Sequence, residues 1–201
     1  DQTIAQIGGK IKAGDAEVIA CQGLVISPGL IDAHVHLRQP GHEYKETIKS
    51  GTAAAAAGGF SAVACMPNTS PVNDSRAVTD FILDTAAQEG SARVYPVGAV
   101  TMGLKGAELT EMAELQEAGC VAVSDDGRPV ADSRLMRRAM EYAATFDLPV
   151  ICHSEDLQLS ASGHMHEGPT STRLGITGIP DLAEVLAIER DLALAGLTGA
   201  R

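Results

Sequence analysis

Two histidines and an arginine alternate in the segment His34-Val-His-Leu-Arg38, directly after an apolar run that begins at Gly29. Residues i and i+2 of an extended chain project from the same face, so the imidazoles of His34 and His36 would stand about 6 to 7 Å apart along a strand. Two imidazoles at this spacing can converge on one metal ion, and Arg38, with the same parity, could hold a carboxylate through two parallel hydrogen bonds. Ordinary polar residues at a strand end show the same pattern, so the metal interpretation depends on partners elsewhere in the chain.

Other polar side chains stand where a short apolar segment runs out into a loop. They are Asn68, Asp125, Asp126 and His153. In a barrel of parallel strands these ends gather around one mouth, which is where such enzymes place their active sites. Imidazole and carboxylate ligands suit zinc, which lowers the pKa of bound water and polarises a carbonyl group. The pattern therefore favours metal-assisted hydrolysis.

A repeating unit of apolar strand, polar loop, amphipathic helix and glycine stop runs from residue 24 onward. Strand starts near residues 30, 60, 92, 120 and 149 give the spacing of a βα unit. The expected strands cover residues 24–37, 60–66, 93–100, 120–124 and 149–153. The expected helices cover residues 43–57, 74–88, 110–119, 132–146 and 180–195, with Asp74 and Thr110 among the N-caps and Gly196 as the last stop.

Short apolar strands that alternate with helices indicate an α/β fold with a parallel sheet buried on both faces. A doubly wound sheet and a (β/α)₈ TIM-type barrel both fit this order. The first strand is not followed by a glycine-rich phosphate loop, and polar residues follow several different strands, so we favour the barrel. Eight units need about 250 residues, so this chain is expected to form an incomplete barrel over residues 24–201. Residues 1–23 are β-leaning and rich in turns, and we expect them to belong to a small β-sandwich domain.

The composition narrows the classes of partner. The chain has 201 residues, 45% of them hydrophobic, and a formal net charge of −11. Such a charge argues against nucleic acid or an anionic membrane as a general partner. No apolar run approaches the roughly 20 residues of a membrane span, and the first residues do not resemble a secretion signal, so a cytoplasmic protein is expected. The cysteines are widely spaced in apolar segments without a CxxC motif, and we expect buried, reduced thiols.

Four segments at these intervals resemble the dihydroorotases of the amidohydrolase superfamily, specifically the class with Asp-Asp-Gly after the fourth strand. They are GLIDAHVHLRQPG, EYKETIKSGTAAAAAGGFSAVACMPNT, VSDDG and CHSED. The resemblance implies that one or two zinc ions are bound by His34, His36, Asp126 and His153, and that Arg38 and Asn68 hold the substrate. It also implies a histidine on the next strand and a proton-shuttle aspartate, both expected beyond Arg201, so no catalytic proton shuttle is assigned within this chain.

The leading functional hypothesis is therefore zinc-dependent interconversion of carbamoyl-aspartate and dihydroorotate in pyrimidine biosynthesis. A second hypothesis is an allantoinase or hydantoinase, which would share the barrel and the chemistry. Many related hydrolases bridge their two metals with a carboxylated lysine. The last lysine here is Lys105, so no lysine follows the fourth or any later strand, and Asp126 could bridge two metals instead. A third hypothesis is an inactive homologue that serves as a structural partner of aspartate carbamoyltransferase. The further expected partners are the remaining polypeptide of the barrel and other copies in a homo-oligomer.

Three further features receive less specific interpretations. Asp125 is expected to be a turn residue or a carboxylate that supports the site, and not a ligand, because Asp-Asp-Gly is also ordinary turn chemistry. His164 and His166 repeat the His-x-His spacing between Ser, Gly and Pro, which favours a flexible loop. Cys152 alternates with His153 and is expected to point away from the site.

Overall fold

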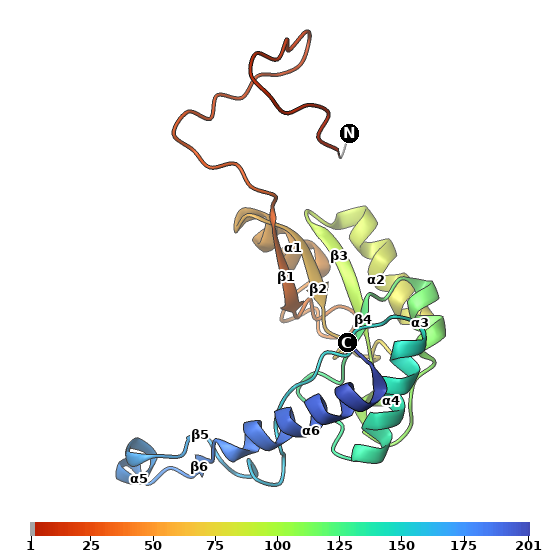
Figure 1. Cartoon of the computed structure of the whole chain (residues 1–201), viewed down its shortest axis with the longest axis vertical. Coiled ribbons are helices and arrows are strands. Elements are labelled where there is room, and N and C mark those ends of the chain that lie inside the picture. Colours follow the sequence, from red (N-terminus) through yellow and green to blue (C-terminus); the bar gives the residue numbers. More distant parts are fainter. Residues whose placement is uncertain (1–2) are drawn as a thin grey trace.

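The computed structural model describes residues 3–201, and its centre is a curled, four-stranded parallel sheet in the order β1-β2-β3-β4 (Figure 1). The strands are β1 (Leu30–Val35), β2 (Phe60–Cys65), β3 (Arg93–Gly98) and β4 (Ala122–Val123). The helices that follow them are α1 (Ile48–Ala57), α2 (Arg76–Glu89), α3 (Met112–Ala118) and α4 (Ser133–Thr145), with a 3₁₀ turn at Met102–Leu104. Since every strand runs the same way, all carboxyl ends meet at one edge. The predicted α/β fold with a parallel sheet is confirmed, and the curled sheet is consistent with the predicted incomplete barrel.

The fifth predicted strand is present only as a short continuation of the sheet. The backbone N–H of Val123 donates to the carbonyl of Pro149 (3.0 Å), and the N–H of Ile151 donates to the carbonyl of Val123 (2.9 Å). On the other side, the N–H of Val150 reaches only the carbonyl of Arg201 (2.7 Å). The strand is shorter than the expected 149–153. On the side away from β4, its backbone is paired only through the hydrogen bond from Val150 to Arg201.

The two larger of three apolar clusters pack helices against the sheet. One lies between β1 to β3 and the helices α1 and α2, and the other surrounds β4 and α4. The first contains Leu37, Ile48, Val63, Cys65, Val78, Ile82 and Val94, and the second contains Val100, Met112, Val123, Val130, Met136, Ala139, Met140, Ala143 and Leu148. Burial of these side chains fixes the strand ends, and with them the polar residues that follow.

Several helix starts differ from the prediction because the expected cap is used elsewhere. Helix α1 begins after Thr47, whose hydroxyl accepts from the N–H of Ser50 (3.1 Å), since residues 38–45 form turns instead of helix. Asp74 does not cap α2, because its carboxylate accepts from the N–H of Gly103 (2.8 Å). Thr110 does not cap α3, because its hydroxyl donates to the carbonyl of Ala99 (2.7 Å). Asp132 caps α4, because its carboxylate accepts from the N–H groups of Arg134 (2.8 Å) and Leu135 (3.0 Å).

The segment after the fifth strand contains regular structure that the sequence did not indicate. It consists of β5 (Met165–His166), α5 (Pro169–Leu174) and β6 (Gly178–Ile179), and leads into α6 (Leu182–Thr198). The strands β5 and β6 pair in parallel, so His166 lies in a short strand and the flexible-loop interpretation is wrong for it. Helix α6 continues past the predicted stop at Gly196 to Thr198, and its C-cap is Gly199, whose positive φ (71°) favours glycine.

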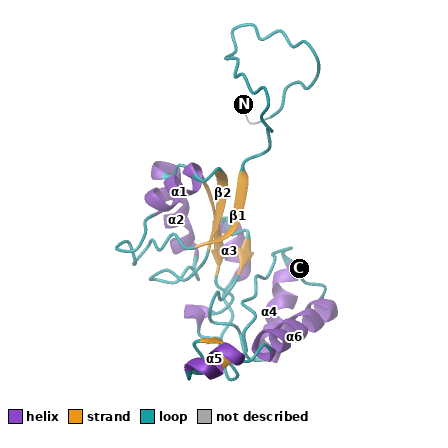
Figure 2. Cartoon of the chain, turned by 90° about the vertical axis from the view of Figure 1, so that its left-hand side faces the viewer, coloured by secondary structure: helices purple, strands orange, loops and turns teal. Residues whose placement is uncertain are grey.

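The described residues before β1 contain neither helix nor strand and extend away from the sheet in both views (Figures 1 and 2). The first strand begins at Leu30 and not at residue 24, because the apolar side chains before it have nothing to pack against: Val25 and Ile26 are 95% and 79% exposed. A small β domain is therefore not formed by residues 3–23 themselves. Over the described range, no helix has the length and apolar character that crossing a bilayer requires.

Candidate metal centre

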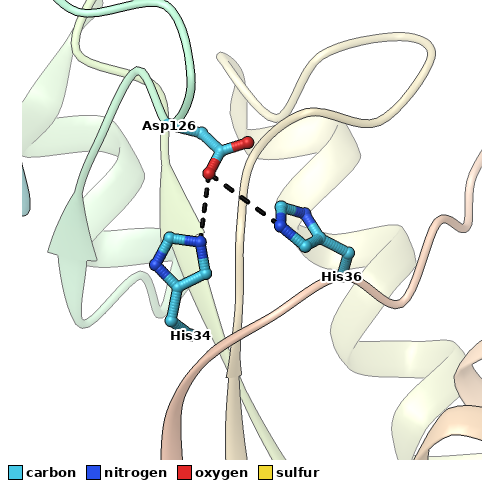
Figure 3. Close-up of side chains that lie close together, drawn as sticks. All are labelled: His34, His36 and Asp126. Carbon is cyan, nitrogen blue, oxygen red and sulfur yellow. Dashed lines mark hydrogen bonds and ion pairs between the residues drawn. The ribbon is translucent and has the colours of Figure 1, made fainter. Parts of the chain in front are cut away.

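His34, His36 and Asp126 converge at the carboxyl edge of the sheet (Figure 3). His34 lies in β1, His36 follows that strand, and Asp126 follows β4. The Nε2 atom of His34 is 3.1 Å from Oδ1 of Asp126, and the Nε2 atom of His36 is 4.0 Å from the same oxygen. One ligand atom from each residue lies within 4.8 Å of the other two. Two imidazoles and a carboxylate at this separation could bind one metal ion between them.

The Asp126 carboxylate is buried at the base of the cluster, whereas the His34 side chain is 46% exposed. Asp126 has a positive φ of 49°, a conformation that aspartate tolerates better than most residues. Its backbone N–H donates to the hydroxyl of Ser124 (2.9 Å), which holds the turn. The chain therefore reverses sharply after β4 and presents the carboxylate to the histidines.

Asp125 points to the other side of the same turn. Its carboxylate accepts hydrogen bonds from the backbone N–H groups of Val100 (2.8 Å) and Thr101 (2.9 Å), and from the Thr101 hydroxyl. Burial raises the pKa of Asp125, and these hydrogen bonds oppose the increase. The residue ties the loop after β3 to the loop after β4, which agrees with the prediction of a supporting role.

Asn68, which follows β2, contacts both kinds of ligand. Its Oδ1 atom is 2.9 Å from Nδ1 of His36, and its Nδ2 atom donates to Oδ2 of Asp126 (2.5 Å). The sequence placed Asn68 at the site but gave no indication of these contacts. Its predicted role in holding the substrate stays a prediction.

His153 lies outside the cluster of three. Its Nε2 atom is 2.9 Å from Oε2 of Glu155, although His153 and Asp126 line the same small cavity. Hydrogen bonds from Ser160 and His153 lower the pKa of Glu155. The structure therefore brings together three of the four predicted ligands, and the role of His153 as the fourth stays a prediction.

Arg38 does not continue the alternation of β1. The strand ends at Val35, and Arg38 has a positive φ of 62° within a turn closed by the His42 N–H and the Arg38 carbonyl (2.9 Å). Gly41 allows this turn to pack against the loop that carries Asn68, because a Cβ atom at Gly41 would collide with the carbonyl of Ser70. Across residues 3–201, the Arg38 guanidinium makes no ion pair. Its charge is therefore available to an anionic ligand.

A cavity of about 350 Å³ adjoins the cluster. It lies between the loops that follow β1, β2, β3 and β4, and its walls include His42, Asn68, Thr69, Gly103, Asp126 and Arg128. A wider hollow lies near the opposite edge of the sheet, between α2 and the first residues of β2 and β3. Only the first of these contains a candidate metal ligand, so it is the better candidate for a substrate pocket.

Cys152 packs on the outer side of the sheet, as predicted. It contacts the apolar cluster around β4 and α4. Burial and the neighbouring carboxylate of Asp191 raise the pKa of the Cys152 thiol to about 12. Within the described structure all four cysteines are free.

Comparison with known proteins decides the family. The family model described as "Dihydro-orotase-like" matches residues 23–201. The chain belongs to this dihydroorotase-like family. This confirms the resemblance drawn from the four sequence segments.

Similar curated proteins carry the same family name. The chain is 60% identical over 201 residues to a dihydroorotase from Syntrophotalea carbinolica, covering 100% of the chain and 47% of that protein. It is 66% identical over 176 residues to a dihydroorotase from Syntrophobacter fumaroxidans, covering 88% of the chain and 40% of that protein. The chain thus spans about half the length of the curated relatives that it matches.

A solved structure shares the fold of this dihydroorotase-like chain. The L-hydantoinase (dihydropyrimidinase) from Arthrobacter aurescens superposes with a TM-score of 0.69 at 20% identity, over 87% of this chain and 40% of that protein. At this identity the likeness extends to the fold alone. It supports the incomplete barrel inferred from the parallel sheet.

Proposed function

We propose that this protein is a zinc-dependent cyclic amidohydrolase that interconverts carbamoyl-aspartate and dihydroorotate in pyrimidine biosynthesis. The observation that carries the proposal is the convergence of His34, His36 and Asp126 at the carboxyl edge of a parallel sheet. Membership of the dihydroorotase-like family supports the choice of substrate.

The donor set fits zinc. His34 and His36 supply imidazole nitrogens, and Asp126 supplies a buried carboxylate, which are ligands that zinc prefers. Bound zinc lowers the pKa of water and acts as a Lewis acid toward an amide carbonyl. Oδ1 of Asp126 faces His34 while Oδ2 faces Asn68, so the two oxygens could serve one or two ions. His153 is the proposed fourth ligand and would exchange its contact with Glu155 for the metal.

Arg38, in the turn after β1, and Asn68, in the wall of the cavity, suit an anionic substrate despite the acidic composition. The Arg38 guanidinium is proposed to hold the substrate carboxylate, and Asn68 to bind the substrate beside it. In ring opening, water adds to the amide carbonyl and the ring nitrogen leaves with a proton. The proton shuttle is proposed to be an aspartate, and a further histidine to complete the metal ligands, both from polypeptide outside residues 1–201.

The remaining proposals concern the context of the chain. We propose that further polypeptide closes the barrel, that residues 1–23 contribute to a small β-sandwich domain, and that the protein is cytoplasmic and homo-oligomeric. Aspartate carbamoyltransferase is a candidate partner. The unpaired edge of β1 and the exposed apolar face of α6, which includes Leu192 at 67% exposure, support closure by further polypeptide.

The alternatives have less support. A hydantoinase or allantoinase would share the fold, but no lysine follows Lys105 to provide a carboxylated bridge, and the similar curated proteins are named dihydroorotase. An inactive homologue would be expected to have lost ligands, whereas three of the expected ligands converge.

The test is metal analysis of the full-length gene product together with absorbance assays on dihydroorotate, hydantoin and allantoin. We expect bound zinc and hydrolysis of dihydroorotate only. Zinc uptake with turnover of hydantoin or allantoin instead would favour the second hypothesis. A folded protein without activity on any of them would favour the third.

A further inference from the structure

We propose that Asn68 is a positioning residue of the metal centre, whose side-chain amide fixes both the orientation of the Asp126 carboxylate and the site of the proton on the His36 ring. The inference rests on the proposed function, since it concerns the same metal ligands. It adds a role to Asn68 that differs from contact with the substrate.

The orientation of the Asn68 amide follows from its contact with Asp126. An ionised carboxylate can only accept hydrogen bonds, so the amide nitrogen and not the amide oxygen must face Oδ2 of Asp126 (2.5 Å). Asp126 therefore directs the Asn68 amide nitrogen toward itself and leaves the amide oxygen facing His36.

The opposite end of the amide then determines the tautomer of His36. The Asn68 Oδ1 atom is an acceptor only, so Nδ1 of His36, 2.9 Å away, must carry the hydrogen. In the neutral imidazole this leaves the lone pair on Nε2, which faces Asp126 Oδ1 at 4.0 Å. That separation leaves room for a metal ion between the two atoms. The ring therefore already has the tautomer that binds metal through Nε2 before any metal arrives.

His34 provides a contrast within the same cluster. Its Nε2 atom lies 3.1 Å from the Asp126 carboxylate, so in the metal-free protein this nitrogen carries the hydrogen that is donated. The two histidines are thus expected to have opposite tautomers. Asn68 contacts only one of them, which makes His34 an internal reference.

The loop that carries Asn68 is held independently of the ligands. The N–H groups of Thr69 (2.8 Å) and Asn73 (3.0 Å) both donate to the carbonyl of Pro67, and the Thr69 hydroxyl donates to the carbonyl of Pro71 (2.7 Å). Because Asn68 follows β2, its amide spans from the end of β1 to the end of β4. One of its two N–H groups remains for the cavity that it lines, so positioning is compatible with substrate contact.

The experiment uses the full-length protein and two variants that separate the two contacts. Asn68→Leu removes both the acceptor and the donor, whereas Asn68→Asp keeps an acceptor for His36 but loses the donor to Asp126. Thr69→Ser, which keeps the hydroxyl in the same loop, is the matched control. The tautomers of His34 and His36 are read in the metal-free protein by long-range ¹H–¹⁵N NMR, and the zinc dissociation constant is measured by competition with a chelator.

We expect the wild type, Thr69→Ser and Asn68→Asp to show the Nδ1–H form of His36, and Asn68→Leu to lose it while His34 is unchanged. The zinc dissociation constant of Asn68→Leu should rise about 10- to 100-fold, as is typical when a group that orients a metal ligand is lost. An unchanged tautomer of His36 in Asn68→Leu, or a zinc dissociation constant within about twofold of the wild type, would overturn the proposal. If Asn68→Leu fails to fold, loss of the Nδ1–H form in Asn68→Asp would overturn it.

The outcomes also separate this inference from the proposed function. A raised KM for dihydroorotate in Asn68→Leu, with tautomer and zinc affinity unchanged, would leave the proposed reaction in place and reduce Asn68 to a substrate contact. The expected tautomers and zinc affinities in a protein that does not hydrolyse dihydroorotate would retain the positioning role and reject the reaction.

Discussion

Asp125 and Asp126 are adjacent in the chain, yet their carboxylates face opposite sides of one turn. Asp125 accepts hydrogen bonds from the loop after β3, whereas Asp126 faces His34 in β1 and His36 directly after it. The turn after β4 thus separates a carboxylate that supports the fold from one that is available to a metal.

This division predicts different consequences for alanine substitutions at the two positions. Asp125→Ala leaves two buried backbone N–H groups without an acceptor, and should lower the free energy of unfolding by about 3 kcal/mol. Asp126→Ala should change stability less in metal-free protein but weaken zinc binding at least about tenfold. Urea unfolding and chelator competition measure the two effects. If Asp125→Ala lost zinc while keeping its stability, the two roles would have been exchanged.

Arg38→Ala should weaken substrate binding without changing zinc content. The guanidinium is proposed to hold a carboxylate, so its removal should reduce kcat/KM by an amount equivalent to about 2 to 3 kcal/mol. Arg38→Lys is the matched control, because it keeps the charge but loses the two-pronged geometry, and should recover only part of the activity. Steady-state kinetics with parallel zinc analysis provides the measurement. Loss of zinc in Arg38→Ala would contradict the proposed role.

His153 and Glu155 provide a test of the fourth ligand. If His153 leaves Glu155 to bind metal, His153→Ala should raise the zinc dissociation constant at least about tenfold, whereas Glu155→Ala should not raise it. Isothermal titration with zinc would distinguish the two variants. Equal zinc affinity in His153→Ala and the wild type would leave the cluster with His34, His36 and Asp126 only.

The N-cap of α4 predicts a pH dependence of stability. Hydrogen bonds from the N–H groups of Leu135 and Arg134 lower the pKa of Asp132. A carboxyl group whose pKa is lowered by folding stabilises the folded state above its unfolded pKa, and this contribution is lost as the pH falls through the folded pKa. Asp132→Asn keeps a cap that does not titrate, so its urea midpoint should fall less than that of the wild type below about pH 4.

Asp132→Ala should have a lower urea midpoint than the wild type at pH 7, because the cap is lost, and the difference should shrink on acidification. The variant differs from Asp132→Asn only in the capping group. A constant difference between wild type and Asp132→Ala from pH 7 to pH 3 would show that the charge of Asp132 does not contribute.

The sequence predicted those parts of the site that depend on strand order. His34 and His36 lie at the end of the first strand, and Asp126 follows the fourth. The carboxyl ends of these parallel strands lie at one edge of the sheet, so the three side chains were expected to meet there. The contacts of Asn68 could not be predicted, because they depend on how the loop after β2 folds over its own backbone. The pairing of His153 with Glu155 likewise depends on the position of a side chain two residues away.

The same distinction applies to the fold. Apolar periodicity located the first four strands and their helices, since burial dominates their formation. Helix starts were less predictable, because Asp74 and Thr110 have side chains suited to capping but form hydrogen bonds with other loops. Polar residues occur throughout residues 154–181. The short parallel pairing of β5 with β6 in this segment is formed by backbone hydrogen bonds, which leave no apolar pattern in the sequence.

The contact between His34 and Asp126 joins residues that are 92 positions apart. The histidine pair is local and is complete once residue 36 has been synthesised, but the carboxylate arrives only after three further strands. A metal ion held by all three would therefore act as a cross-link that closes a long loop, and would restrict the unfolded chain if it remained bound there. Zinc should accordingly slow unfolding more than it accelerates folding, because the long loop must close before the third ligand can engage.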